Sequence, residues 1–441
     1  MQARNRKIAM VSLGCAKNLI NTEQMMFLIK RAGYELTGET KGAVAVIVNT
    51  CAFIESARME SIETILELGQ AKDRGEIGRL IVTGCLPQRY REEILGEIPE
   101  IDAVLGTGSF DDIVGAIERK KGSDDEKEWF GDINTRVSET GRVLTTPPSW
   151  TYIKIAEGCD NRCAYCAIPD IRGRFRSRPM DNIITEAREL ASRGVRELIL
   201  VAQDVTRYGL DLYNKRSLTE LLNGLSGIDG LKWIRLHYLY PDEFDDELID
   251  EIAKNDKILK YVDIPIQHIN GKILKKMNRR GGSAEIRRLI QRLRGSVPGA
   301  VLRTSIITGL PGEGESQFEE LCDFLREARI ERTGIFTFSP EDGTPAALMA
   351  RPEPEVAARR KELLEDIQSR IMDEFNKSRI GSETEVLVEG NREGYMYGRS
   401  YAESPDIDGH ITIEGSGFLA GDFIRARITG TMDNEPVGEK I

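Results

Sequence analysis

The stretch Glu157-Gly-Cys-Asp-Asn-Arg-Cys-Ala-Tyr-Cys166 carries three cysteines, Cys159, Cys163 and Cys166, at the spacing C-x₃-C-x₂-C. A cubic iron–sulfur cluster is normally held by four cysteine thiolates. Three thiolates would leave one iron without a protein ligand, and catalytic metal sites keep such an open position whereas structural sites close it. The stretch therefore predicts a reactive cluster, held by these three cysteines, that can bind a small molecule.

The composition is that of a globular protein with real cores. The chain has 441 residues, of which 40% are hydrophobic, and this length suggests about three domains. No run of 18 apolar residues occurs, so we expect no membrane-spanning helix and no membrane partner. The seven cysteines, without an evident export signal, indicate a reducing compartment, and we expect the cytoplasm. The net charge of −11 argues against a general affinity for nucleic acid.

Residues 6–121 are expected to form the first domain. Short apolar runs alternate here with helical patterns, and continuous apolar strands joined by helices are typical of a parallel sheet that is covered on both faces. The expected strands are residues 7–14, 44–49, 80–84 and 104–106, and the expected helices are residues 21–31, a stretch from 55 onward, and 111–120.

A second set of cysteines follows the strands of this domain. Cys15, Cys51 and Cys85 each come directly after an expected strand. The carboxyl ends of parallel strands lie on one edge of the sheet, where open α/β sheets bind their ligands. One such cysteine would fit a small residue in a tight turn, which is the alternative interpretation. Because all three cysteines follow strands in the same way, we favour a second cluster held by their three thiolates.

A linker is expected at residues 122–149. Residues 122–128 are acidic, and Pro147-Pro148 favours an extended chain. The central domain, residues 145–375, should then contain six strand–helix units, which predicts a partial (βα)₆ barrel with function at the carboxyl ends of its strands. The expected strands are residues 151–156, 197–202, 233–237, 261–265, 302–307 and 334–338, with helices at 182–192 and 316–328 among those between them.

Polar and glycine-rich turns follow these strands. They are Gln203-Asp204, His237, Gln267-His268 and residues 309–313, while Cys159 follows the first strand and is expected on the same face. Residues 309–313 (Gly-Leu-Pro-Gly-Glu) lack the Gly-Lys-Ser/Thr ending of a phosphate-binding loop, and taken alone they fit a plain turn.

Three further features of the central domain have simple interpretations. Residues 172–179 are strongly basic, and they fit either a site for an anionic substrate or cofactor carboxylate, or a solvated loop. Cys322 lies at helical spacing among apolar residues and is expected to be a buried structural thiol. A charged amphipathic helix is expected at residues 355–375, and its apolar face would carry Leu363, Ile367, Ile371 and Phe375.

The last domain, residues 378–441, is expected to be a small antiparallel β-barrel of OB-like size. From residue 380 onward, twelve Asp and Glu stand against four Arg and one Lys. Such a balance is unfavourable next to phosphates, and it would steer association with a basic protein. The expected strands are residues 383–389, 395–401, 410–414 and 422–429.

With both cysteine sets in view, nearly the whole chain resembles the radical S-adenosylmethionine (SAM) methylthiotransferases. The C-x₃-C-x₂-C motif, with Tyr165 before its last cysteine, resembles the radical SAM signature. Cys15, Cys51 and Cys85 match the positions of the family's second cluster, and the last domain resembles a TRAM domain. Two stretches, Ser12-Leu-Gly-Cys-Ala-Lys-Asn18 and residues 398–409 (GRSYAESPDIDG), resemble the branch that modifies ribosomal protein S12, the RimO type.

This chain departs from the S12 branch at one position, and it differs from the sister branch in the charge of its last domain. The S12 branch commonly has proline where Ala16 stands, a departure that touches no ligand. The sister branch modifies an adenosine near the tRNA anticodon and usually carries a basic C-terminal barrel. The acidic barrel of this chain therefore makes tRNA an unexpected partner and ribosomal protein S12 the expected one.

The resemblance implies two [4Fe-4S] clusters and SAM as cofactors. The cluster on Cys159, Cys163 and Cys166 would bind SAM and, with an electron from a donor protein, cleave it to a radical. The second cluster would carry the sulfur that is delivered to the β-carbon of an aspartate in S12. No catalytic side chain is assigned. The resemblance places the SAM contacts at Tyr165, Gln203, Asp204, Gly309, Gly312 and Glu313.

Other functions share part of this pattern. A tRNA adenosine methylthiotransferase would use the same chemistry on another substrate. An electron carrier with two clusters, or an RNA-binding protein with structural zinc, would need no substrate chemistry, although structural sites prefer a full set of ligands.

Overall fold

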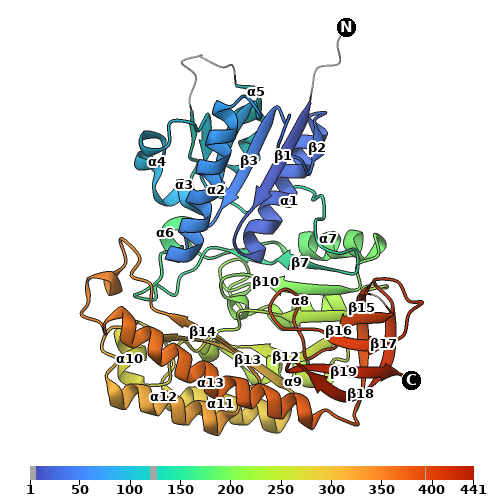
Figure 1. Ribbon diagram of the computed structural model, residues 1–441. Helices are drawn as coiled ribbons and strands as arrows, with labels where there is room; N and C mark the ends of the chain where they lie inside the picture. The colour runs from blue at the N-terminus through green and yellow to red at the C-terminus, as the bar shows by residue number, and fades with distance from the viewer. Residues whose placement is uncertain (1–5, 120–126, 393) are drawn as a thin grey trace. The chain divides into compact units, whose positions relative to one another are not determined.

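The computed structural model describes residues 6–119, 127–392 and 394–441 (Figure 1). The chain divides into two compact units, and each is described by itself. The first unit contains the described residues up to 145 together with 156–178 and 339–347, and the second contains residues 146–155, 179–338 and 348–441. Most of the acidic stretch expected at residues 122–128 lies outside the described residues.

The first unit is built on a six-stranded sheet in the order β2-β1-β3-β4-β5-β6, and all of its strand pairs are parallel. Side chains alternate between the two faces of each strand. Because every strand pair is parallel, the predicted parallel sheet is confirmed. Its strands are β1 Lys7–Ser12, β2 Glu35–Thr37, β3 Ala45–Thr50, β4 Arg79–Gly84, β5 Ala103–Leu105 and β6 Glu128–Trp129.

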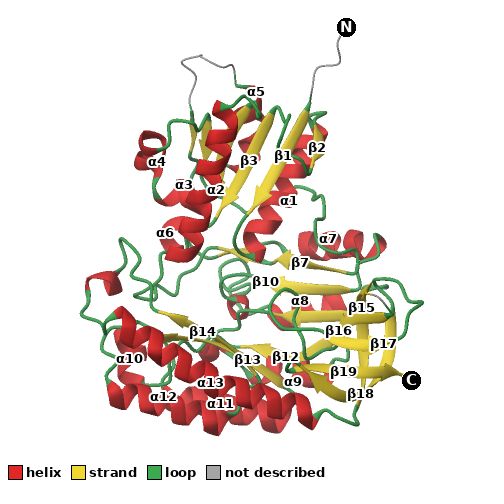
Figure 2. Ribbon diagram, in the orientation of Figure 1, coloured by secondary structure: helices red, strands yellow, loops and turns green. Residues whose placement is uncertain are grey.

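Helices cover both faces of this sheet (Figure 2). Ile47 and Ile81 point to the core on one face, with residues of α1 and α5, whereas Val48 and Val82 point to the core on the other face, with residues of α2, α3 and α4. The helices of the unit are α1 Ala16–Arg31, α2 Glu55–Asp73, α3 Cys85–Arg89, α4 Arg91–Glu97, α5 Ile113–Glu118 and α6 Ile168–Arg172, with a 3-10 turn, η1, at Phe110–Asp112.

The structure corrects two details of this domain. Helix α1 begins at Ala16, five residues before the expected start, because its first turns bury polar side chains such as Asn18 that apolar periodicity does not register. Strands β2 and β6 were not expected, and β6 lies within the expected linker. With three and two residues, they are too short to show an alternating pattern.

The second unit contains an open sheet in the order β14-β13-β12-β11-β10-β7, again with every pair parallel. All six expected strands are present within a few residues of their predicted bounds, so the partial (βα)₆ barrel is confirmed. The strands are β7 Trp150–Lys154, β10 Glu197–Val201, β11 Trp233–Leu236, β12 Ile258–Asp263, β13 Val301–Thr308 and β14 Arg332–Thr337.

Helices connect these parallel strands, as in a βα barrel. They are α7 Met180–Ser192, α8 Leu218–Ser226, α9 Asp246–Lys254, α10 Gly271–Lys276, α11 Ser283–Ser296, α12 Glu315–Ala328 and α13 Pro354–Ser378. Short 3-10 turns are η2 Val205–Arg207, η3 Pro241–Glu243 and η4 Pro345–Leu348. No helix in the described part of the chain is both long and apolar enough to cross a membrane.

The last two helices show where apolar periodicity succeeds and where it is misleading. Cys322 is buried in α12, as expected for a structural thiol. In α13 the expected apolar face is confirmed at Ile371, which is buried, but it is wrong at Leu363, which is 49% exposed while the neighbouring Leu364 is fully buried. The buried stripe of α13 includes Gln368, whose amide donates to the carbonyl oxygens of Ile330 and Glu331, just before β14, and apolar periodicity does not register such a buried polar side chain.

A closed five-stranded barrel ends the second unit, in the order β15-β16-β17-β19-β18. Its pairs are antiparallel except β17 with β19, which is parallel. The predicted small barrel is confirmed, with a fifth strand, β19, that was not expected. The strands are β15 Glu383–Arg392, β16 Tyr395–Arg399, β17 Ile411–Glu414, β18 Phe423–Met432 and β19 Glu435–Lys440.

Residues 398–409, which we call the docking segment, fasten this barrel to the central sheet. The guanidinium of Arg399 is fully buried, donating to Glu197 of β10 (2.7 Å, Nη2 to Oε2) and to Glu389 of β15 (2.7 Å, Nε to Oε1). Arg235 of β11 donates to the other oxygen of Glu197 (2.8 Å) and to the carbonyl oxygen of Tyr401 (2.9 Å). One buried carboxylate is therefore shared by two arginines from different parts of the fold.

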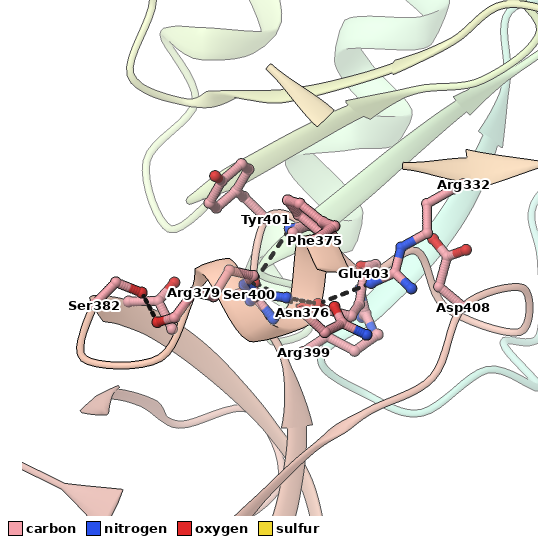
Figure 3. Close-up of polar contacts among 12 residues, drawn as sticks. Arg332, Phe375, Asn376, Arg379, Ser382, Arg399, Ser400, Tyr401, Glu403 and Asp408 are labelled. Atoms are coloured by element: carbon pink, nitrogen blue, oxygen red, sulfur yellow. Dashed lines mark hydrogen bonds and ion pairs between the residues drawn. The ribbon is translucent and has the colours of Figure 1, made fainter. Parts of the chain in front are cut away.

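Glu403 forms a second buried ionic centre in the docking segment (Figure 3). Its carboxylate pairs with Arg332 of β14 (3.3 Å) and with Arg379, which follows α13. It also accepts hydrogen bonds from the backbone N–H (3.0 Å) and the hydroxyl (2.7 Å) of Ser400. Since a buried charge is costly unless paired and hydrogen-bonded, these contacts tie the barrel to the end of the central sheet.

Part of the acidic charge counted in the last domain is buried. Glu389 and Glu403 are neutralised inside the unit by arginines. Asp408 accepts from the hydroxyl of Tyr261 on β12 (2.7 Å), and Ser404 contacts His237 after β11 (2.9 Å). The histidine expected at a strand end therefore contacts the docking segment.

We expect Glu403→Gln to destabilise the second unit and to change its response to acid. Burial alone would raise the pKa of Glu403, but Arg379 and Arg332 lower it from 4.5 to about 2. Such a carboxylate stabilises the fold above pH 4.5, and the contribution is lost as the pH falls towards 2. At pH 7 the variant should lose about 3–5 kcal/mol of unfolding free energy. Urea unfolding at several pH values measures this.

The matched control for this experiment is Glu414→Gln, at an exposed position on β17. The difference between wild type and Glu403→Gln should shrink below pH 5, where the unfolded carboxyl takes up its proton. A difference that stays constant between pH 7 and pH 3 would contradict the assigned pKa.

Candidate active site

Cys15, Cys51 and Cys85 lie at the carboxyl ends of the neighbouring strands β1, β3 and β4 in the first unit. Cys15 directly precedes α1, Cys51 directly follows β3, and Cys85 is the first residue of α3 after β4. The loops are close: a Cβ added at Gly14 would lie 2.6 Å from the Cβ of Cys51. Gly14 also has a φ of +88°, so only glycine suits this position.

The three thiols influence one another electrostatically. Burial, reinforced by the neighbouring Cys85, raises the pKa of Cys51 to about 12, and burial also raises the pKa of Cys85. Burial acts against ionisation of Cys15 too, but the charges of Lys17 and Arg172 outweigh it and lower the pKa of that thiol. Three neighbouring thiols, two of them buried, repel one another when ionised, so a positively charged centre is what would hold them as thiolates. The donor set therefore fits an iron–sulfur cluster.

Cys159, Cys163 and Cys166 lie on a loop of the first unit between β8 (Ala156–Glu157) and α6. The antiparallel pairing of β8 with β9 (Arg176–Ser177) closes this loop. All three cysteines are partly exposed, as a site that must admit a small molecule requires. Tyr165 is partly buried on the same loop. This donor set also fits a cluster with an open iron.

Two backbone hydrogen bonds give the cysteine loop its shape. The N–H of Cys159 donates to the carbonyl oxygen of Gly173 (3.1 Å), and the N–H of Cys166 donates to that of Cys163 (3.0 Å). A Cβ at Gly158 would lie 2.0 Å from the carbonyl oxygen of Arg174, and the φ of Gly158 is +77°. Any side chain at this position would push the two ends of the loop apart.

The basic stretch 172–179 is only partly a solvated loop, because Arg174 is exposed whereas two other arginines of the stretch are buried. Arg172 is buried and donates to Glu157 (2.8 Å), to the amide oxygen of Asn18 (2.7 Å) and to the sulfur of Cys85 (3.6 Å). Arg178 is buried as well and pairs with Glu139. A run of arginines resembles a solvated loop in sequence, because their partners lie far away along the chain.

None of the seven cysteines forms a disulfide. Within the described residues, no group of three His, Cys, Asp or Glu side chains is arranged to hold a single metal ion. A cubic cluster takes one thiolate for each iron, so its ligands stand farther apart than those of a single ion.

Gln203 and Asp204 lie in the second unit, directly after β10. Asp204 is fully buried and accepts a hydrogen bond from the hydroxyl of Thr206, the middle residue of the short turn η2. Their proposed contact with SAM stays a prediction.

Residues 309–313 follow β13 and form a turn that is held by buried charges. Glu313 accepts from the N–H of Gly309 (3.1 Å) and from Arg360 of α13 (2.8 Å), and its other oxygen lies 3.3 Å from Nε2 of His268. Nδ1 of His268 accepts two backbone N–H groups, which places the proton on Nε2, facing Glu313. This turn is therefore more constrained than a plain turn, and Arg360 is a supporting residue that sequence periodicity did not single out.

Three family models match successive parts of the chain. The radical SAM superfamily matches residues 153–325, the uncharacterized protein family UPF0004 matches residues 7–106, and the TRAM domain matches residues 380–441. A protein of Caldanaerobacter subterraneus subsp. tengcongensis, named ribosomal protein uS12 methylthiotransferase RimO, is 48% identical over 440 residues, covering 98% of this chain and 100% of its own length. The chain belongs to the RimO family.

Two further members of the RimO family match the chain with similar identity and coverage. The protein of Acetivibrio thermocellus is 47% identical over 99% of this chain and 98% of its own length, and that of Geobacter sulfurreducens is 46% identical over the whole of both. These relatives confirm the resemblance to the radical SAM methylthiotransferases and to their S12 branch.

Solved structures share the fold at low identity. The radical SAM methyltransferase TsrM from Kitasatospora setae, solved with cobalamin and a [4Fe-4S] cluster bound, has a TM-score of 0.56 at 16% identity, covering 89% of this chain and 80% of its own. The cobalamin-dependent radical SAM enzyme OxsB has a TM-score of 0.51 at 12% identity, covering 83% of this chain and 56% of its own. At this identity the likeness concerns the fold alone.

Proposed function

We propose that this protein methylthiolates the β-carbon of an aspartate in ribosomal protein S12 by a radical mechanism, with two [4Fe-4S] clusters and SAM as cofactors. One observation carries the proposal: a RimO-family chain presents two separate sets of three thiols within one compact unit. Cys159, Cys163 and Cys166 would hold one cluster, and Cys15, Cys51 and Cys85 the other. A protein with thiol ligands of this kind requires a reducing compartment, and we place it in the cytoplasm.

When bound, the clusters and SAM supply the electron, the radical and the sulfur that amino acid side chains cannot supply. The chain supplies ligation and orientation. Gly158 and the pairing of β8 with β9 keep the partly exposed cysteine loop closed on itself. Gly14 allows the loop of Cys15 to approach Cys51. Arg172 and Asn18 then connect the two cysteine segments.

The SAM contacts are proposed at Tyr165, Gln203, Asp204, Gly309, Gly312 and Glu313. Gly309 and Gly312 both have positive φ, so the turn carries no side chain at either position and can approach a ligand through its backbone. Glu313 is already bonded to Arg360 and lies against His268, and we therefore assign it the task of holding this turn in shape.

The exposed charge of the C-terminal barrel indicates the surface that would meet the S12 protein. With Glu389 and Glu403 neutralised internally, the exposed negative charge of the C-terminal barrel rests on residues such as Glu414, Asp433 and Glu435. We propose that these residues steer the basic S12 protein towards the enzyme, which affects the rate of association more than the affinity. An electron donor protein is also required. The same charges disfavour tRNA, since they would face its phosphates.

Product analysis tests the function directly. The anaerobically reconstituted enzyme, with SAM, a reductant and a sulfide source, is incubated with S12 and separately with an anticodon-loop RNA. We expect S12 to gain the mass of one methylthio group in place of hydrogen, and the RNA to remain unchanged. A mass gain on the RNA alone would sink the proposal in favour of the tRNA enzyme.

Metal analysis tests the cofactors independently of turnover. Iron and sulfide should be present at the level of two clusters per chain after reconstitution. Zinc at full occupancy that iron does not displace would favour the structural-zinc alternative. Clusters without any SAM cleavage under reducing conditions would favour the electron carrier.

A further inference from the structure

One buried guanidinium connects the two cysteine sets. Arg172 is the last residue of α6, six positions after Cys166, and it is only 3% exposed. Its Nη1 donates to Glu157 (2.8 Å), which stands two positions before Cys159. Its Nη2 faces the sulfur of Cys85 at 3.6 Å. Arg172 thus contacts the segment that carries one set and a ligand of the other.

The same nitrogen acts on the two remaining cysteines through Asn18. Nη2 of Arg172 donates to the amide oxygen of Asn18 (2.7 Å), which leaves the amide N–H groups facing the opposite side. There they donate to the carbonyl oxygens of Leu13 (3.0 Å) and Thr50 (2.8 Å), which precede Cys15 by two positions and Cys51 by one. Because an amide can turn by 180°, a cation at its oxygen selects the orientation that joins these two loops.

The charge of Arg172 is also placed where a cluster would respond to it. Its guanidinium cannot lose its proton in a protein. Hydrogen bonds to the ligand sulfurs and net charge are among the factors that set the reduction potential of an iron–sulfur cluster. A positive charge in a buried position acts more strongly than one in water, because little solvent screens it. A cation beside a thiolate favours the reduced, more negative state.

We propose that Arg172 is a positioning residue of the second cysteine set. It orients Asn18 so that the loops of Cys15 and Cys51 are fixed, and its charge and N–H beside Cys85 raise the reduction potential of the cluster held there. The inference rests on the proposed assignment of a second cluster to Cys15, Cys51 and Cys85. The competing view is a purely structural ion pair with Glu157, which would leave the potential unaffected.

The full-length chain with Cys159, Cys163 and Cys166 all replaced by alanine isolates the second cluster. In this parent we compare Arg172→Met, Arg172→Lys and Arg174→Met by redox titration of the reconstituted proteins, followed by absorption and electron paramagnetic resonance. Arg174→Met is the matched control, since it removes the same charge from the same loop at a side chain that is 78% exposed.

We expect Arg172→Met to shift the potential to a more negative value than Arg174→Met, with Arg172→Lys in between, since lysine keeps the charge but cannot bind Glu157, Asn18 and Cys85 together. Equal potentials in Arg172→Met and Arg174→Met overturn the proposal. If Arg172→Met retains no cluster, Arg172→Lys decides: a potential below that of Arg174→Met supports the proposal and an equal one overturns it. If the parent itself assembles no cluster, the second-cluster assignment fails, and this inference fails with it.

Discussion

Reconstituted Cys163→Ala enzyme is expected to lose reductive cleavage of SAM, with methionine and 5′-deoxyadenosine falling below detection. The proposed cluster has only three thiolate ligands, one for each of three irons. Removing one thiolate leaves a second iron without a protein ligand, so the cluster that must activate SAM is no longer held. Cys163 lies partly exposed on the loop between β8 and α6, so the substitution leaves no large cavity in a core. Chromatography of the products formed with dithionite measures the effect.

The control for this experiment is Cys322→Ala. Cys322 is a buried thiol of α12 that belongs to neither cysteine set, and its replacement should cost about 1 kcal/mol of stability and spare the cleavage. Cleavage by Cys163→Ala at the wild-type rate would mean that the C-x₃-C-x₂-C motif does not hold the cluster that activates SAM.

Cys51→Ala should separate the cleavage of SAM from the methylthiolation of S12. It removes a ligand from the second set and leaves the loop of Cys159, Cys163 and Cys166 untouched, so SAM cleavage should continue while no methylthiolated S12 forms. The iron content should fall towards half that of the wild type, because only one complete set remains. Product mass, SAM cleavage and iron content are measured on the same preparation.

Cys51 is buried, so a loss of folding must be separated from a loss of chemistry. Retained SAM cleavage serves as the internal control for folding, because it requires an intact loop in the same compact unit. Full methylthiolation by Cys51→Ala would show that Cys15, Cys51 and Cys85 are misassigned.

Much of the candidate site could be predicted from local patterns. Cys15, Cys51 and Cys85 each follow an apolar strand, and the parallel order β1-β3-β4 brings these strand ends to one edge as expected. The six strands of the central sheet were predicted because buried parallel strands are continuous apolar runs that stand out between amphipathic helices. Both signals are short in range, and that is why a single sequence is enough to show them.

The roles of the buried arginines could not be predicted from local patterns. Arg172 and Arg178 looked like part of one basic loop, yet they are buried and paired with Glu157 and Glu139. Arg399 and Glu403 belong to the stretch that resembled the S12 branch, and the structure shows them fastening the C-terminal barrel to the central sheet. A charged residue has the same appearance in sequence whether it meets water or a distant partner.

By itself, the sequence determined the two sets of three thiols, their places after strands, a parallel α/β sheet, a partial βα barrel and a small β-barrel, and the family. Each of these depends on spacing and on apolar periodicity, which are properties of neighbouring residues. Only the tertiary structure decided that Arg172 stands between the cysteine sets and that Glu403 is turned inward. Those facts depend on partners as distant along the chain as Asn18 from Arg172, and a buried charge is acceptable only when the fold brings such a partner to it.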